Sequence, residues 1–414
     1  MSQAAEQALQ VQTSWQIVPL SEVCEFKPSK DIPRSMLASD AAVSFVPMSD
    51  LGELVKYFDA KEFRSFADVV KGYTYFADGD VLCAKITPCF ENGKLGIAGD
   101  LENGVGFGSS EFVVMRPKHQ LLAEYLYYYL SRDEFREAGA RVMSGAVGHK
   151  RVPKEYFEDQ PIPLPPLEEQ KRIVAVLDQA FAAIDRARAH AEANLADGQQ
   201  LVAAAMEQLF PNDREMTVGR SLGDLCEAII DCEHKTAPTQ DLGIPSIRTP
   251  NIGKGRLRLD GVNRVSEETY REWTRRAEPQ PGDLILAREA PAGNVAVIPE
   301  GMRVCLGQRT VLLRPKKDLF IPTYLAHLLL MPSSQTRLLA HSRGATVQHI
   351  NVKDIRAFKV STLPSLAKQS AVVQRIERLM AQGKSLADAY ARKLADLANL
   401  RQSLLQKAFS GQLT

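Results

Sequence analysis

Cysteine, tryptophan, excess charge of one sign and long apolar runs are all scarce in this sequence. Its 414 residues include six cysteines and two tryptophans, and 51 basic residues balance 50 acidic ones, so the formal charge is +1 with histidine neutral. A balanced chain is not a polycation, and any nucleic-acid binding must come from local basic patches. The cysteines form no CxxC pair, and Cys83 and Cys89 are too far apart for a zinc knuckle. We therefore expect free thiols and no metal site.

Targeting and membrane signals are missing as well. Residues 1–12 are polar and rich in Ala, Gln and Glu, unlike a signal peptide, and no apolar run reaches the length of a membrane span. Together with the unpaired cysteines, these features predict a protein of the reducing cytoplasm.

Motifs of nucleotide-binding and catalytic sites are also absent. The sequence has neither GxGxxG nor GxxxxGK[ST], and PIPLPPLEEQ lacks the Asn and the aromatic residue of a methyltransferase Asn-Pro-Pro-Tyr loop. Asp80, Glu91 and Lys94 resemble a nuclease cluster, but in the second half Asp283 is followed by Glu289 and no matching lysine. Gly-Asp before an apolar run is more simply a tight turn into a strand. We expect no catalytic residues.

What the sequence does contain is a long-period repeat. LPPLEEQKRIV begins at Leu164 and LPSLAKQSAVV begins at Leu363, an offset of 199. Further matches follow in collinear order at offsets of 198 to 203, as expected when loops are inserted into a duplicated unit. They pair Cys24 with Cys226, Gly79-Asp80 with Gly282-Asp283, Arg116-Pro117-Lys118 with Arg314-Pro315-Lys316, Tyr125-Leu126 with Tyr324-Leu325, and Phe210 with Phe409.

Each half begins with a segment of mixed α and β character. Short apolar runs broken by Gly, Pro, Asn and Asp predict strands at 43–48, 81–86, 112–115, 284–286 and 311–313. One helix is predicted from Leu121 to about Glu137, with a counterpart from Thr323 to about Leu339. The fold class is therefore α+β, with two mixed α/β domains.

Each half ends in one long helix. Pro165 and Pro166 precede the first one, and Glu168 and Glu169 suit the positive end of its dipole. Apolar residues follow at heptad spacing in both copies, interrupted by Gly198 and Gly383. A helix of this size is roughly 60 Å long at 1.5 Å per residue, too long for the inside of a compact domain.

Charge distinguishes the two helices. Residues 168–210 carry seven acidic and four basic residues, whereas residues 366–409 carry eight basic and three acidic ones. Opposite net charge with matching apolar stripes favours pairing with each other in an antiparallel coiled coil. Two solvated faces on unrelated helices remain the alternative.

LPPLEEQKRIV from Leu164 and LRQSLLQKAFSGQL from Leu400 to Leu413 resemble the conserved regions of the specificity subunit of type I restriction–modification enzymes. The order of variable domain, long helix, variable domain and long helix fits as well. The resemblance implies a flexible tail at 1–13, a target recognition domain at 14–165, a helical region at 166–212, a second recognition domain at 213–364 and a second helical region at 365–414.

The resemblance implies a prokaryotic, non-catalytic subunit. Each recognition domain would read one half of an asymmetric, bipartite site in double-stranded DNA. The helices would set the spacing of the half-sites and dock two modification subunits, and restriction subunits would complete the complex. S-adenosylmethionine, ATP and Mg²⁺ would be cofactors of those partners and not of this chain.

Duplication within one chain offers an independent physical argument. Two readers on one duplex need a rigid spacer, because half-site spacing is set by the rise of the double helix. A homodimer would impose a palindromic site, whereas a duplicated and diverged chain does not. The competing interpretations are a coiled-coil scaffold with protein-binding ends and the recognition module of a stand-alone methyltransferase.

Phosphate and base contacts are expected from local clusters of basic and amide side chains. The first two clusters are the glycine-containing loops RVMSGAVGHKRVPK and RGATVQHINVK, with Arg141, His149, Lys150 and Arg151, and with Arg343, Thr346, Gln348, His349 and Asn351. A third, predicted as a hairpin loop, contains Arg248, Lys254, Arg256 and Arg258. Further candidates in turns are Lys85, Thr87, Asn92, Lys94, Arg288, Asn294, Gln308 and Arg309. Solvated polar loops are the simpler interpretation of each.

Helix pairing and partner docking are assigned to residues at the starts and along the apolar stripes of the long helices. These are Leu167, Gln170, Ile173, Leu177, Ile184, Leu366, Gln369, Val372, Ile376, Leu379, Leu404 and Phe409.

Overall fold

The computed structural model describes residues 15–32, 41–146, 148–210, 219–233, 235–340, 348–360 and 362–413. The predicted tail at 1–13 lies outside these residues. The chain forms two compact units, one from residues 1–192 and 391–414 and the other from residues 193–390. We call them unit 1 and unit 2.

Unit 1 is built around an antiparallel four-stranded sheet. Its central strand β6 is buried along its whole length because both faces of the sheet are covered. Successive side chains alternate, so Val81 and Cys83 join the core that contains helix α5, while Leu82 and Ala84 join a second cluster on the other face. The strand order is β2 (Cys24–Phe26), β9 (Phe112–Pro117), β6 (Val81–Ala84) and β7 (Leu95–Ile97).

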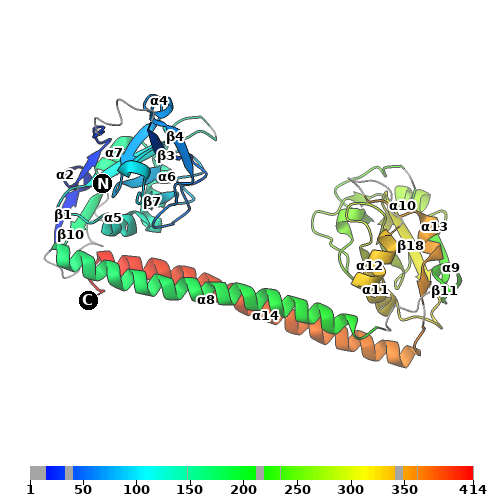
Figure 1. Ribbon diagram of the computed structural model, residues 1–414. Helices are drawn as coiled ribbons and strands as arrows, with labels where there is room; N and C mark the ends of the chain where they lie inside the picture. Colours follow the sequence, from blue (N-terminus) through cyan, green and yellow to red (C-terminus); the bar gives the residue numbers. More distant parts are fainter. Residues whose placement is uncertain are drawn as a thin grey trace. The chain divides into compact units, whose positions relative to one another are not determined.

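Unit 1 also contains a mixed sheet, a two-stranded ribbon and short helices (Figure 1). The mixed sheet has the order β4 (Glu62–Ser65), β3 (Ala42–Val46), β8 (Val105–Gly108) and β5 (Thr74–Ala77), with β3 parallel to β8. The ribbon pairs β1 (Gln16–Pro19) with β10 (Pro161–Leu164). The helices are α2 (Leu20–Val23), α4 (Phe66–Val69), η1 (Glu102–Gly104), α5 (Ala123–Leu130), α6 (Asp133–Arg141) and α7 (Lys154–Glu158).

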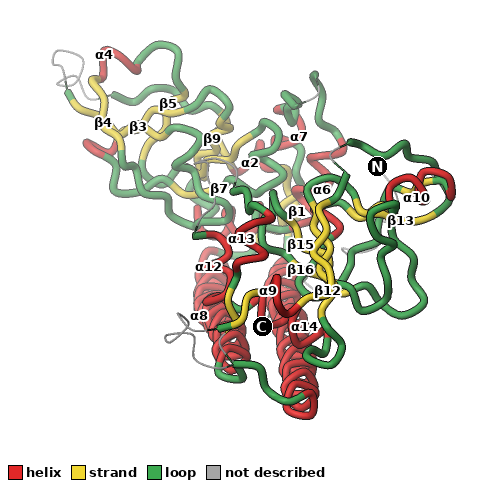
Figure 2. The backbone as a smooth tube through the Cα atoms, turned by 90° about the vertical axis from the view of Figure 1, so that its right-hand side faces the viewer, coloured by secondary structure: helices red, strands yellow, loops and turns green. Residues whose placement is uncertain are grey.

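Unit 2 repeats this plan. Its four-stranded sheet, whose strands β12, β15 and β16 are labelled in Figure 2, has the order β12 (Cys226–Asp231), β18 (Thr310–Pro315), β15 (Leu284–Ala287) and β16 (Val295–Val297). A three-stranded sheet follows, β14 (Arg264–Val265), β13 (Ile244–Ile247) and β17 (Cys305–Leu306), and a ribbon of β11 (Arg220–Ser221) with β19 (Lys359–Val360). The helices are α9 (Leu222–Leu225), η3 (Thr249–Asn251), α10 (Glu267–Trp273), α11 (Pro322–Leu330), α12 (Pro332–Leu339) and α13 (Val352–Ala357).

An equivalent ion pair between a buried aspartate and an arginine links neighbouring strands of the main sheet in both units. The Arg116 guanidinium donates to the Asp80 carboxylate from Nε at 2.7 Å and from Nη2 at 2.8 Å. Arg314 contacts Asp283 in the same way, at 2.9 and 2.7 Å. Each aspartate also accepts a backbone N–H three residues earlier, which makes Gly-Asp the predicted tight turn. The repeat and the α+β class are therefore confirmed, and Asp80 has a structural role.

The predicted single helix after β9 is wrong in both halves. It is split into α5 and α6 in unit 1 and into α11 and α12 in unit 2. The break falls at Arg132 and at Met331, whose backbones are extended with ψ of 142° and 143°. Met331 precedes Pro332, and the residue before a proline is disfavoured in the helical region.

The two long helices are α8 (Leu167–Glu207) and α14 (Leu366–Phe409). In unit 1 the start of α8 lies beside the end of α14 (Figure 1), and the Arg401 guanidinium lies 3.2 Å from the Asp185 carboxylate and 4.2 Å above the Phe181 ring. In unit 2 the end of α8 lies beside the first half of α14, where Leu386 fills the space that a side chain at Gly198 would occupy. In unit 2, Val202 lies later in α8 than Gly198 and meets Gly383, which lies earlier in α14 than Leu386, so the described segments of this unit run antiparallel.

Candidate nucleic-acid interface

The candidate interface in each unit is one end of the main four-stranded sheet. In unit 1, β2 and β6 finish at this end and β9 begins there, because both pair antiparallel with β9. In unit 2, β12, β15 and β18 have the same arrangement. We call this the loop end of each unit, since it is where the predicted contact residues that flank these strands converge.

The loop end of unit 1 holds a basic groove. It is a cavity of about 620 Å³ whose aromatic lining includes Tyr73 and Tyr75. Among the described residues that line it, none is acidic, and five are basic: Lys27, Lys30, Lys85, Arg151 and Lys154. Tyr73 is exposed by 38%, whereas Tyr75 is buried, and positive charge beside an exposed aromatic ring is a combination that nucleic-acid sites use.

Two predicted residues, Lys85 and Arg151, meet in this groove. The backbone N–H of Val152 donates to the Lys85 carbonyl at 2.9 Å, which joins the two loops. Arg151 donates from Nε and Nη2 to the Glu111 carboxylate at 2.9 and 2.8 Å, and this bonding lowers the pKa of Glu111. His149 and Lys150 are exposed on the same loop, and Arg141 is exposed at the end of α6, as a DNA contact requires.

The other turn candidates of unit 1 are engaged inside the domain. Asn92 donates to Glu53 at 3.0 Å, and the Lys94 ammonium donates to the Met48 carbonyl at 2.7 Å. The Thr87 hydroxyl contacts Glu91 at 2.9 Å. These bonds hold neighbouring loops in place.

The loop end of unit 2 carries a network of charged side chains instead. Arg288 donates to Asp231 at 2.9 Å and contacts His349 Nε2 at 2.9 Å through its other Nη atom. His349 Nδ1 lies 2.8 Å from one oxygen of Glu289, whose second oxygen lies 2.9 Å from Arg309 Nε. The predicted Arg288, His349 and Arg309 thus belong to one connected set. Only Arg309 is mostly exposed, with 63% of its side chain accessible, against 10% for Arg288.

The predicted hairpin cluster of unit 2 forms a second polar surface. An antiparallel bridge between Ile252 and Leu257 closes the turn. Arg248 and Arg258 line a cavity of about 390 Å³, and Lys254 and Arg256 are exposed beside it. Asn294 donates to the Ile252 carbonyl at 2.9 Å and thereby ties the turn to the segment before β16.

The remaining candidates of unit 2 are placed as follows. Gln348 is exposed and Gln308 is half-buried. Asn351 donates to Asp354 at 3.0 Å at the start of α13. Arg343 and Thr346 lie outside the described residues.

The helix residues fall into two groups. Most are buried or half-buried: Gln170, Ile173, Leu177, Ile184, Gln369, Val372, Ile376, Leu379, Leu404 and Phe409. Leu167 and Leu366, which are related by the repeat, keep 36% and 38% of their surface exposed. The buried group therefore anchors the helices, and the exposed pair is accessible to a partner.

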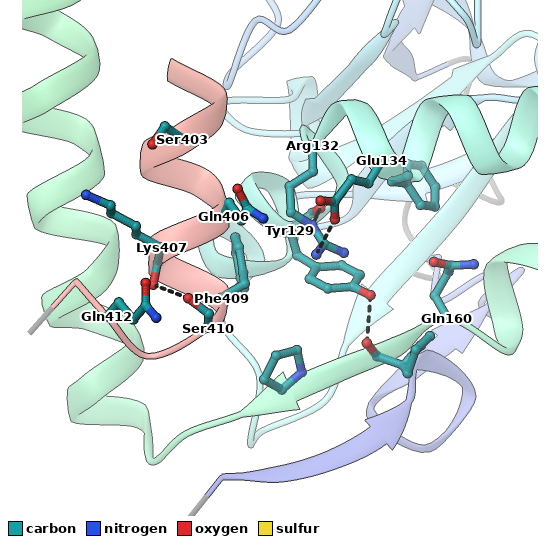
Figure 3. Close-up of a pocket in the computed structure, with 13 residues that line it drawn as sticks. Tyr129, Arg132, Glu134, Gln160, Ser403, Gln406, Lys407, Phe409, Ser410 and Gln412 are labelled. Atoms are coloured by element: carbon teal, nitrogen blue, oxygen red, sulfur yellow. Dashed lines mark hydrogen bonds and ion pairs between the residues drawn. The ribbon is translucent and has the colours of Figure 1, made fainter. Parts of the chain in front are cut away.

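Phe409 also borders a cavity of about 570 Å³ in unit 1 (Figure 3). Tyr129 and Arg132 form one wall, and the last turns of α14 with Lys407 form the other. The Phe409 ring packs 5.3 Å from the Tyr129 ring, so this is the place where the end of α14 contacts the domain. Among the described residues around the cavity, none is a predicted DNA contact.

Several residues of the loop ends were not predicted. Lys27 and Lys30 come from a loop after β2 that carries no motif. Asp231 and Glu289 are acidic, and a prediction of DNA contacts favours basic and amide side chains. The repeat contains a usable signal, because Lys85 and Arg288 are equivalent at an offset of 203 and both lie at the loop end.

The fold and its two loop ends define a class: a duplicated α+β protein that presents two related but different polar surfaces and anchors them on long helices. Residues 12–192 and 216–387 match the family described as type I restriction modification DNA specificity domain. The chain belongs to this family.

Individual relatives agree. The specificity subunits of the type I restriction enzymes EcoAI and EcoEI of Escherichia coli are 36% and 35% identical over 198 and 205 residues, which is 48% and 49% of this chain and 33% and 34% of theirs. That of EcoBI is 27% identical over 66% of this chain and 62% of its own length. The chain thus spans about a third of the first two relatives and somewhat under two thirds of the third.

Solved structures share the fold. One, described as the structural basis of complex assembly and conformational transition of a type I R-M system, has a TM-score of 0.78 at 23% identity and covers 98% of this chain and 100% of its own. The HsdS subunit from Thermoanaerobacter tengcongensis has a TM-score of 0.62 at 22% identity, covering 97% and 98%. These structures show the shared fold, and the family match favours a DNA specificity domain over the scaffold interpretation. Among the described residues, no helix is long and apolar enough to cross a membrane.

Proposed function

We propose that this chain is the DNA-recognition subunit of a type I restriction–modification complex and reads a bipartite, asymmetric site. The observation that carries the proposal is the pair of loop ends. They occupy equivalent positions in a duplicated fold but differ in chemistry, one an open basic groove and the other a charged network. Equivalent positions suit two related tasks on one duplex, and different side chains suit different half-sites.

The predicted contact residues are proposed as DNA ligands at these loop ends and on the hairpin of unit 2. Basic side chains in the groove would contact phosphates, which fix register without reading sequence. Exposed arginine and amide side chains of the loops would read base edges. The domain boundaries at 14–165, 166–212, 213–364 and 365–414 are proposed with these roles.

The two long helices are proposed to pair as an antiparallel coiled coil that spaces the recognition domains. Support comes from the Arg401–Asp185 ion pair in unit 1 and from the packing of Leu386 on Gly198 and of Val202 on Gly383 in unit 2. Small residues allow close approach of two helices at these points.

Partner docking is proposed on exposed leucines that the repeat relates. Leu167 and Leu366 are one pair, and Leu201 and Leu400, exposed by 71% and 47%, are another at the same offset of 199. Each unit contains one leucine of each pair. Each unit thus exposes two leucines that the repeat relates to those of the other unit, and two similar surfaces fit two copies of one partner, here the modification subunits.

The chemistry is assigned to those partners. S-adenosylmethionine would be bound by the modification subunits, and ATP with Mg²⁺ by the restriction subunits, while this chain positions them on DNA. A cytoplasmic setting in a prokaryote is part of the proposal, because the DNA substrate lies there.

A domain exchange tests the proposal. Residues 219–365 are replaced by the second domain of another family member, and the methylated motif is determined in the reconstituted complex. We expect one half of the motif to change and the other half to persist. A change in both halves, or in neither, would contradict modular recognition.

A further inference from the structure

We propose that Arg309 reads a guanine in the half-site bound by unit 2, and that Glu289 and His349 are the residues that position it. This inference rests on the proposed function, since it requires duplex DNA at the loop end. It assigns one base to one side chain of this chain.

The network begins at a fixed point inside the sheet. Asp231 ends β12, and Arg288 directly follows β15, so both backbones are set by strand pairing. The Arg288 guanidinium contacts Asp231 at 2.9 Å, and its Nε donates to the Ile350 carbonyl at 3.0 Å. Because this side chain is 90% inaccessible and bonded at three sides, it is a rigid anchor for His349.

Two short contacts connect Arg288 through His349 to Glu289. His349 Nε2 lies 2.9 Å from Arg288, and its Nδ1 lies 2.8 Å from Glu289 Oε1. Glu289 is 19% exposed and lies 2.9 Å from Arg309 Nε through Oε2. A mostly inaccessible carboxylate thus fixes the direction of a mostly exposed guanidinium, which is how supporting residues preorganise a binding group.

The backbone of Arg309 is held in the same way. Its φ is +64°, in the left-handed region that side chains other than glycine rarely adopt. The Arg288 N–H donates to the Arg309 carbonyl at 2.8 Å, and Thr310 continues directly into β18. Such conformations persist where surrounding contacts determine them and gather at ligand-binding sites.

The Nη donors of the Arg309 guanidinium match the acceptors of guanine. The Glu289 oxygen nearest to this guanidinium lies 2.9 Å from Nε, and the two Nη groups are at the tip of a side chain with 63% of its surface exposed. Two parallel donors fit the O6 and N7 acceptors that guanine presents in the major groove. In unit 1 the equivalent position at an offset of 198 is Glu111, whose carboxylate is bound by Arg151. The guanine preference is therefore expected from unit 2 alone.

The test uses the full chain with its modification subunits, and reads the methylated motif by sequencing of modified adenines. The wild-type chain is expected to require a guanine at one position of the half that the exchange of residues 219–365 alters. Arg309→Ala is expected to reduce discrimination at that single base pair by roughly 10- to 100-fold. Arg309→Lys keeps the charge but not the planar pair of donors, and is expected to retain only part of the discrimination.

Matched variants separate positioning from folding. Glu289→Ala is expected to relax the same base pair, whereas Glu289→Gln, which keeps an acceptor for Nε, retains more of the discrimination. Arg303, paired with Glu267 at 2.9 Å and 51% exposed, is the matched control, and Arg303→Ala is expected to leave the motif unchanged.

The outcomes distinguish this inference from the proposed function. A wild-type complex without a bipartite motif overturns the proposed function itself. A bipartite motif whose unit 2 half contains no G·C pair, or keeps its guanine requirement in Arg309→Ala, overturns only the guanine assignment. Uniformly weaker methylation of all sites in Arg309→Ala, with sequence preference intact, would show a phosphate contact and also overturn it.

Discussion

Gln170 and Gln369 are 199 residues apart and make the same three hydrogen bonds in their respective units. The Gln170 carbonyl oxygen accepts the Leu122 N–H at 2.9 Å, and its amide donates to the carbonyls of Gln120 and Pro165 at 2.9 Å each. Gln369 repeats this with Ile321, Leu319 and Pro364. Both side chains are fully buried. Each long helix is therefore fastened at its start to the domain that precedes it in the chain.

Replacement of this glutamine should destabilise unit 1. Gln170→Ala leaves one backbone N–H and two carbonyls without their partner, which costs roughly 2–4 kcal/mol of the free energy of unfolding. Urea unfolding measures the change. Gln179→Ala, at an exposed site nine residues further along α8, is the matched control and should shift the stability by less than about 0.5 kcal/mol. Equal effects of both substitutions would argue against a role of Gln170 in fastening the start of α8 to its domain.

Lysines of the basic groove should set the salt dependence of DNA binding. Lys85→Ala is expected to weaken binding of cognate and unrelated DNA alike, and to reduce the slope of log K against log salt by about 0.9 for each phosphate that the protein no longer neutralises. Titrations of the complex from low to physiological salt measure the slope. Lys61 is exposed elsewhere in unit 1, and Lys61→Ala should leave the slope unchanged. A loss of sequence preference in Lys85→Ala would mean that this lysine reads bases.

Lengthening both helices should lengthen the gap in the recognised site. Seven residues inserted between Gln200 and Leu201 of α8, and seven between Gly383 and Lys384 of α14, add about 10 Å, or close to three base pairs, while preserving the heptad pattern. The methylated motif of the insertion variant gives the gap directly. An insertion in α8 alone breaks the pairing and should abolish methylation. An unchanged gap in the double insertion would contradict the spacer role of the helices.

His327 should make unit 2 less stable in mild acid. It is buried in α11, and desolvation lowers its pKa, with Glu377 opposing and Arg256 assisting that shift. Below its ordinary value of 6.5 the unfolded chain gains a proton that the folded chain resists, so stability falls as pH falls. The urea midpoint of His327→Leu minus that of the wild type should therefore increase as the pH is lowered from 7 to 5. His119→Leu, at an exposed histidine, should show no such trend.

Sequence periodicity predicted the two α+β domains, the strands around 81–86 and 284–286 and both long helices, because repeats and heptads are properties of the chain itself. The Asp80–Arg116 ion pair could not be predicted, because the two residues are 36 positions apart and meet only when β6 and β9 align in the sheet. The split at Arg132 was missed because its own sequence has no proline to signal it.

The candidate interface was predicted less well, and for a related reason. The basic groove gathers its lysines from separate loops, so Lys27 and Lys30 carry no local signal of their own. Arg309 was predicted as one polar turn residue among many. Its support by Glu289 and His349 arises only in the folded domain, where the ends of β12 and β15 lie beside the start of β18.

The proposed function requires one duplicated chain to read two different half-sites. Sequencing of adenine methylation in cells that carry this chain with its modification subunits reveals those half-sites. We expect a single motif with two specified, non-palindromic halves separated by a fixed number of unspecified bases. Methylation without sequence preference, or a palindromic motif, would contradict it.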